Sequence, residues 1–193
     1  MAKKTFNDEV YGKITYKEDY WLLKDRVTFK INNKENIAKA EIDIYNSIYE
    51  NFNMGLMSEG LVKFHRENPE LLRADEAEKV KNGQKALYKK YLIDNIDKTS
   101  YNIEEAALRK REEMLEDETE KTFSEIVGKE KAKRIFQART REEKLASLEL
   151  KRLRVFKDSI EIECKCDWFS PSGGFVIFSD GNVEMFYIDS MSI

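Results

Sequence analysis

The chain has 193 residues, of which 37% are charged and 41% hydrophobic, with a net charge of −3. The 11% aromatic content argues against a disordered chain, and eight glycines with two prolines exclude collagen-like and low-complexity classes. The small net charge provides no overall attraction to nucleic acid or to an anionic membrane. No apolar run approaches the ~20 residues that span a bilayer, and none follows the first lysines as in a secretory signal. We therefore expect a cytoplasmic protein with no cofactor and with free thiols.

The first third of the chain begins with β-prone segments. Residues 13–16 and the alternating residues 26–32 predict strands, with a hairpin turn at the polar residues 17–19. Asn32 and Asn33 end the second strand. Apolar residues then recur three and four apart, which predicts a helix over residues 36–53.

Further helices are expected over residues 57–67, which contain the only histidine, His65, and over residues 75–93. Residues 103–127 hold four basic and nine acidic residues, whereas residues 128–156 hold ten basic and four acidic. Opposite charges on successive halves indicate either two helices folded back near Gly128 or one exposed arm. The sparse apolar positions favour a charged helical arm over residues 103–138 that is dispensable for folding. Thr140 and Glu143 have the spacing of a capping box.

The last 40 residues predict a three-stranded meander. Residues 160–168 alternate, residues 175–178 are apolar on both faces, and residues 183–188 form the return strand. We expect turns at residues 170–174 and at Asp180–Gly181, the latter of type I′. Alternation places Cys164 and Cys166 on one strand face with two isoleucines, so both thiols are expected to be buried, reduced and metal-free.

Catalytic chemistry has only scattered candidates in this sequence. His65 or a carboxylate of the meander would be the acid or base of an enzyme. The glycines at 173–174 lead into a strand, whereas a phosphate-binding loop leads into a helix.

Two sets of charged residues are candidates for binding. Residues 157–193 contain two basic and seven acidic residues, so the meander is expected to present an acidic face to a basic protein partner. The candidate partner-binding residues are Glu161, Glu163, Asp180 and Glu184. Alternatively, the basic helix at 129–144 contacts nucleic acid through Lys129, Lys133, Arg134 and Arg141.

The C-terminal residues also resemble a known family. The segment Glu143–Leu148, the strand Ile160–Trp168, the segment Gly173–Phe178 and the step Asp180–Val183 with a late Asp189 are similar to bacterial domains found among the immunity-type genes of polymorphic toxin systems. This resemblance implies a cytoplasmic α+β domain that binds a partner, with no catalytic residues to carry over.

Together these patterns predict one α+β domain over residues 1–193. An antiparallel sheet of N- and C-terminal strands would carry central α-helices and the charged arm. The leading functional hypothesis is a non-catalytic protein that sequesters a toxin. The alternatives are a phage or mobile-element protein that contacts nucleic acid, and an enzyme.

Overall fold

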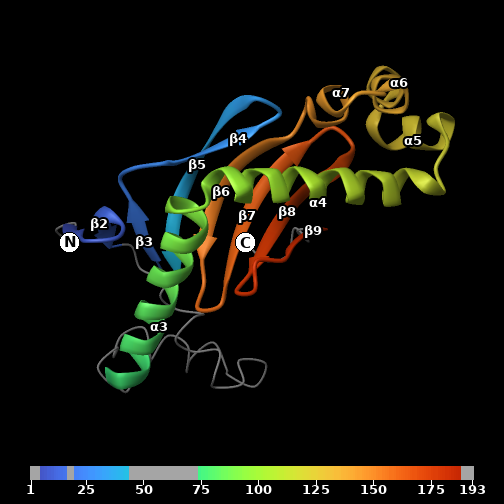
Figure 1. The fold of residues 1–193 in the computed structure, drawn as a ribbon. Helices are drawn as coiled ribbons and strands as arrows, with labels where there is room; N and C mark the ends of the chain where they lie inside the picture. The colour runs from blue at the N-terminus through green and yellow to red at the C-terminus, as the bar shows by residue number, and fades with distance from the viewer. Residues whose placement is uncertain (1–4, 17–19, 44–73, 188–193) are drawn as a thin grey trace.

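The computed structural model describes residues 5–16, 20–43 and 74–187, which form one open mixed sheet with helices packed against it (Figure 1). The N-terminal strands are β1 (Thr5–Asp8), β2 (Gly12–Tyr16), β3 (Tyr20–Leu23), β4 (Val27–Ile31) and β5 (Lys34–Asp43). The helices are α3 (Ala74–Tyr88), the π-helical turn η4 (Lys89–Ile93), α4 (Ile96–Glu116), α5 (Glu120–Val127), α6 (Lys129–Gln137) and α7 (Arg141–Leu145). The C-terminal strands are β6 (Glu149–Val155), β7 (Ser159–Cys166), β8 (Phe169–Phe178) and β9 (Val183–Tyr187).

The α+β class is confirmed. The strands are ordered β1-β2-β3-β5-β6-β7-β8-β9, and β4 pairs with β5 beside this path. Every pair is antiparallel except β5 with β6, so the expectation of a wholly antiparallel sheet is corrected at this one step. The two strands are parallel because the chain leaves the sheet after β5 and returns through the helices before β6, which is the long crossover that parallel pairing requires.

The C-terminal meander is confirmed, with β7, β8 and β9 in consecutive antiparallel pairs. The expected turn at residues 170–174 is wrong, because β8 begins at Phe169 and the turn lies at Asp167 and Trp168. Gly173 belongs to this strand because it pairs with β7 and β9, and the Phe169 ring lies over it. A Cβ at Gly173 would stand 2.5 Å from that ring.

Of the two tight turns, the one at Asn32 and Asn33 ends its strand as expected, and the one at Asp180–Gly181 differs from expectation. Asn32 and Asn33 both have positive φ, 54° and 58°, and join β4 to β5 as a two-residue turn of the I′ kind. At Asp180–Gly181 only Gly181 has positive φ, and its N–H donates to the carbonyl of Phe178. The second turn is therefore a three-residue loop closed by a left-handed glycine, and not type I′.

The helix expected over residues 36–53 is wrong where the structure describes it, because residues 34–43 form β5. Ala38, Ala40 and Ile42 alternate along it and are buried. The strand at 27–31 pairs with β5, and β2 pairs with β3, so the expected hairpin between 13–16 and 26–32 is also corrected. Residues 44–73, with the helix expected at 57–67 and His65, lie outside the described residues.

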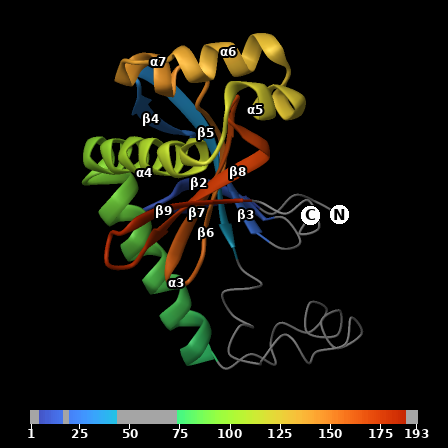
Figure 2. The same cartoon turned by 90° about the vertical axis from the view of Figure 1, so that its right-hand side faces the viewer.

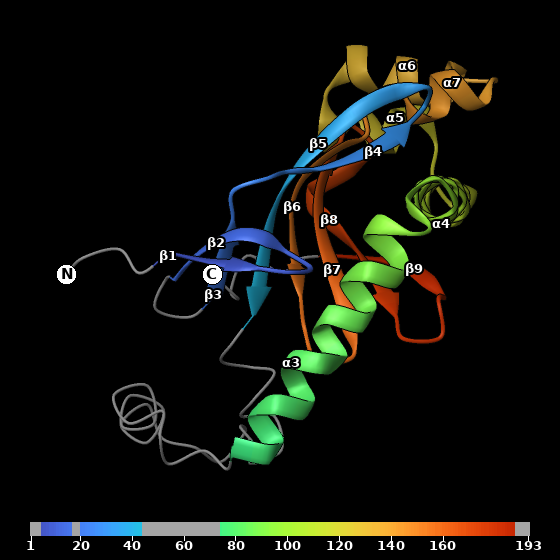
Figure 3. The same ribbon diagram turned by 60° about the vertical axis from the view of Figure 1, so that its left-hand side comes forward.

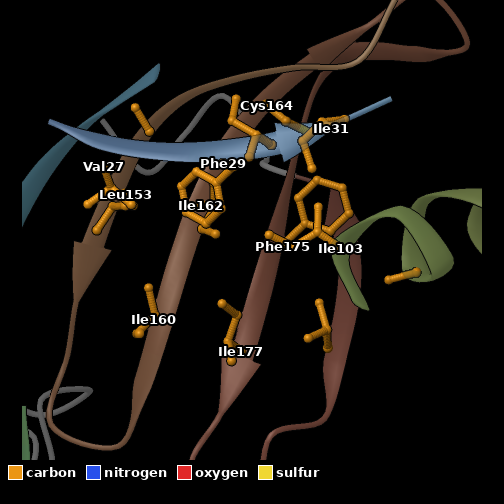
Figure 4. Packing of buried hydrophobic residues seen from close by; sticks show 14 of the residues in the cluster. Val27, Phe29, Ile31, Ile103, Leu153, Ile160, Ile162, Cys164, Phe175 and Ile177 are labelled. Atoms are coloured by element: carbon orange, nitrogen blue, oxygen red, sulfur yellow. The ribbon is translucent and has the colours of Figure 1, made fainter. Parts of the chain in front are cut away.

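The core lies between the C-terminal strands and the elements that cross them. Figure 4 shows β4 passing over β6, β7 and β8 with Phe29 pointing toward Ile162. Phe29 and Ile162 are fully buried. The free edge of β4 is closed by helix α4, since the N–H of Lys30 donates to Ser100 Oγ at 3.1 Å and the N–H of Asn32 to Glu104 Oε1 at 2.6 Å. Covering the edge in this way removes unpaired backbone groups that would recruit another strand.

The helices of the charged segment 103–138 contribute buried residues to the core. Helix α4 crosses the strands of the sheet (Figure 1), and α3 lies beside the lower end of the sheet (Figure 3). Ile103, Ala106 and Ala107 of α4 are buried in the core, and so are Phe123 of α5 and Ile135 of α6. The reversal near Gly128 occurs as one of the two expected arrangements, with φ of 89° at that glycine and α5 packed against α6. The Thr140–Glu143 capping box is confirmed.

Candidate functional site

The side of the sheet opposite α3 and α4 carries a regular array of charged side chains. Both of these helices lie on one side of the sheet, and no helix of the described residues covers the middle of the other (Figure 2). We call this other side of β5–β9 the outer face. Strand register places Glu41, Arg154 and Glu161 in one row across it, continued by Val176 and Glu184. Lys39, Arg152 and Glu163 form the next row.

The part of the outer face on β5 and β6 is an ion-pair network. Glu41 is only 1% exposed, and its two oxygens lie 3.0 Å from Lys39 Nζ and 3.0 Å from Arg154 Nη2. A buried carboxylate requires such partners because its desolvation is otherwise uncompensated. Arg152 reaches Glu163 at 3.2 Å on the neighbouring strand. The arginines of β6 thus moderate the acidic surface that was expected on β7.

The part of the outer face on β8 and β9 has an apolar centre. Val176 and Phe186 are half-buried there, and Phe178 is 37% exposed. Val176 lies between Glu161 and Glu184 in the strand register, so carboxylates flank this side chain on both sides, whereas Phe178 pairs with Ser159 and Phe186 with Gly174. Sequence reasoning did not single out these three apolar residues. The signal for Val176 and Phe178 was the run Phe175–Phe178, which is apolar on both faces although only one face meets the core; Phe186 lies outside this run.

The structure brings together three of the four expected partner-binding residues. Glu161, Glu163 and Glu184 share the outer face, whereas Asp180 lies in the β8–β9 turn, where its Oδ1 accepts from the N–H of Asn182 at 2.8 Å. The same turn is held from the helical side, since the Tyr91 hydroxyl donates to the carbonyl of Ser179 at 3.0 Å. Asp180 therefore stands at the end of the meander and not on its face.

The four basic residues of the alternative nucleic-acid surface are not brought together. Lys129 and Lys133 are exposed one turn apart on α6. Arg134 lies 3.5 Å from Asp167, and Arg141 on α7 binds Glu104 and Glu105 of α4. These carboxylates raise the pKa of Arg141, with Glu105 the larger influence, and hold its guanidinium against the protein.

The two cysteines differ in their surroundings. Cys164 is fully buried with Ile160 and Ile162, whereas Cys166 is half-buried beyond a register shift in the β7–β8 pairing. Burial, with a smaller contribution from Glu163, raises the pKa of Cys164 to about 12, and burial also raises the pKa of Cys166. Both thiols therefore stay protonated at neutral pH. No group of three or more histidine, cysteine or acidic residues within the described ranges is arranged to hold a metal ion.

Comparison of the chain with protein-family models, curated proteins and solved structures found no match. Among the described residues, no helix is both long and apolar enough to cross a bilayer. Function is therefore inferred from the geometry of the outer face and from the chemistry of its residues.

Proposed function

We propose that the protein acts by binding another protein, not by catalysis, and that the outer face of β7–β9 is its contact surface. The partner is a basic protein. Within that class we propose a toxin that this protein sequesters, as the resemblance of the C-terminal residues to immunity-type domains implies.

The observation that carries this proposal is the combination of an apolar centre and an acidic rim. Val176, Phe178 and Phe186 form a small apolar group on a face that the described helices leave open. Protein interfaces concentrate their binding energy in such central apolar anchors, and polar groups around them exclude water.

Charge on this face is graded from β6 to β9. The arginines of β6 form ion pairs with Glu41 on β5 and Glu163 on β7. Glu184 lies on β9, two strands beyond β7, at the opposite side of Val176 from Glu161. No arginine pairs with Glu184 in the strand register, but Arg109 and Lys110 of α4 line the same hollow as this carboxylate. A basic partner would be drawn toward Glu184 from the open side of β9. Such steering raises association rates at low salt and is screened by salt.

The apolar anchor gives a direct test of the contact surface. The full-length tagged chain is purified from its native cell, the co-purifying protein is identified, and the affinity of the purified pair is measured by calorimetry. Phe178→Asp should weaken binding by about tenfold or more, because it puts a charge into the centre of the interface.

Ile126→Asp is the matched control. Ile126 is an apolar residue of α5 with 65% exposure, so this variant adds the same charge away from the outer face. We expect its affinity to equal that of the unaltered chain. Equal affinities for Phe178→Asp and the unaltered chain would remove the outer face from the interface.

The exposure of Lys129 and Lys133 on α6 favours the nucleic-acid alternative. A nucleic-acid surface here would consist of α6 without Arg141, which α4 holds. Fluorescence anisotropy with a labelled DNA duplex tests it. Lys129→Gln with Lys133→Gln should lower the affinity and flatten its salt dependence if phosphate contacts are made there.

A further inference from the structure

The free edge of β9 lies beside a hollow between this strand and helix α4. Among the described residues β9 pairs with β8 alone, so it is the last strand of the sheet. The hollow has a volume of about 380 Å³, and its walls include Arg109 and Lys110 of α4 and Glu184 and Met185 of β9. Glu184 is exposed on the outer face, whereas Met185 is buried in the core. A hollow that contacts both of these neighbours must lie along the edge of the strand.

The register of the β8–β9 pair shows which backbone groups of β9 point to this edge. The N–H of Phe178 donates to the carbonyl of Asn182 at 3.0 Å. Because bonding alternates along an antiparallel pair, residues 182, 184 and 186 bond to β8, and residues 183, 185 and 187 direct their N–H and C=O groups outward. Arg109 Nη2 donates to the carbonyl of Val183 at 3.2 Å, which agrees with this direction. The outward groups of Met185 and Tyr187 bond to no described residue.

The composition of β9 does not protect this edge from another chain. Proteins usually blunt an exposed edge strand with lysine, with proline or with a covering element, as α4 covers β4 here. Residues 183–187 are Val-Glu-Met-Phe-Tyr and contain neither lysine nor proline, and α4 covers only the carbonyl of Val183 through Arg109. Extended peptides bind to such edges by adding a strand, with main-chain hydrogen bonds for affinity and side-chain contacts for specificity.

Two unmatched charges flank the edge on opposite sides of the sheet. Arg109 is exposed on the helical side and forms no salt bridge with a described residue. Glu184 is exposed on the outer face, where it accepts from Asn182 Nδ2 at 3.0 Å and pairs with no described cation. Lys110 is already matched, since its Nζ lies 2.9 Å from Glu113. Side chains alternate between the faces of a strand, so a chain beside β9 fits best with a basic residue toward Glu184 and an adjacent acidic residue toward Arg109.

We propose that the β9 edge binds an extended segment of another protein, which adds an antiparallel strand through the backbone of Met185 and Tyr187. A basic residue of this segment lies opposite Glu184, and the acidic residue that follows it lies opposite Val183, beside Arg109. Apolar or β-branched residues precede the charged pair and continue the sheet. The site adjoins the apolar group of the outer face, but its occupation does not require the partner proposed for that face.

Two synthetic peptides test the site by NMR titration of the isotope-labelled full chain. The first is valine-threonine-valine-lysine-glutamate with both ends capped, and the second exchanges its last two residues and so keeps composition and charge. Each is added up to about 5 mM, where a complex with a 1 mM dissociation constant is close to saturated. We expect the first peptide to shift the amide signals of Met185 and Tyr187 saturably and to protect both amides from solvent exchange. The second should bind about threefold to tenfold more weakly, because both cross-strand charge pairs are reversed.

Two variants assign the binding to the backbone of the edge. Met185→Pro removes the outward N–H and no hydrogen bond to β8, which is where a strand tolerates proline. Met185→Ala is the matched control, since it also loses the side chain but keeps the N–H. We expect the proline variant to lose peptide binding and the alanine variant to retain it.

Several results would overturn the proposal. They are equal binding by the two variants, equal affinities for the two peptides, or no saturation with the first peptide. If Met185→Pro does not fold, protection of the Met185 and Tyr187 amides in the unaltered chain decides. Protection of these amides that rises with protein concentration in the absence of peptide would show that a second copy of this chain occupies the edge, and would also overturn the proposal.

Discussion

Replacing Ile103 by alanine tests whether the charged helix α4 belongs to the core. Ile103 is fully buried against the sheet, with Phe175 of β8 nearby (Figure 4). The substitution removes three carbon atoms, worth about 2.4 kcal/mol of transfer free energy at ~0.8 kcal/mol per methylene. The cavity left behind adds to this, so we expect a total loss of about 3–4 kcal/mol.

The assay is urea unfolding followed by circular dichroism, with the free energy of unfolding extrapolated to water. Ile126→Ala is the matched control, since Ile126 belongs to the same charged stretch and is 65% exposed. We expect its loss to stay below about 0.5 kcal/mol. A loss under about 1 kcal/mol for Ile103→Ala, or equal losses for both variants, would show that the helix is an accessory arm.

Three other predictions address the strand, the thiols and an acid-sensitive ion pair. Gly173→Ala should destabilise the fold by about 1–3 kcal/mol in the same assay, because its Cβ would meet the Phe169 ring; an unchanged free energy would refute that packing. With a thiol pKa of about 12, Cys164 is thiolate in roughly one molecule in ten thousand at pH 8, so it should react with a thiol reagent only after denaturation, and rapid labelling of folded protein would contradict its burial. Burial acts to raise the pKa of Asp8, but the Lys85 ammonium and two backbone N–H groups hold it below 3.8. This group therefore stabilises the fold above about pH 4, and the contribution is lost as pH falls through the folded-state pKa. Asp8→Asn should lower the free energy of unfolding at pH 7 and make it fall less steeply as the pH is lowered. A pH profile of the variant that runs parallel to that of the unaltered chain would contradict this.

Local signals in the sequence were sufficient for several elements. The meander strands, the helices over 75–93 and the Thr140 cap follow from alternation, periodicity and capping spacing. Each of these signals lies within a few residues of the element it specifies.

Elements set by distant contacts were not predictable in the same way. The sequence of strand β5 favours a helix because Ile37 and Ala40 are three residues apart and alanine has a weak preference for strands. What decides its structure is pairing with β3, β4 and β6. Likewise, the glycine-rich stretch at 173–174 resembles a turn, but it is extended because it pairs with β7 on one side and β9 on the other.

In the candidate sites, too, local sequence signals placed some residues, whereas distant contacts determine the surroundings of others. Alternation correctly placed Glu161 and Glu163 on one strand face, but the arginines opposite them come from β6 and were not anticipated. Arg111 is one of many charged residues of α4, and only the folded structure reveals that it is buried.

The association rate of the co-purified partner is the most direct measure of binding through the outer face. Glu161→Gln with Glu184→Gln removes two carboxylates that flank Val176 and preserves their shape. Glu116→Gln with Glu120→Gln makes the same change in net charge at exposed positions of α4 and α5. Stopped-flow measurements compare both variants with the unaltered chain at low and at high ionic strength.

We expect Glu161→Gln with Glu184→Gln to slow association about threefold to tenfold at low salt, and the control pair to have a clearly smaller effect. The difference should vanish near 1 M salt, where the Debye length falls to about 3 Å. Equal rates for the two double variants at low salt would contradict binding through the outer face.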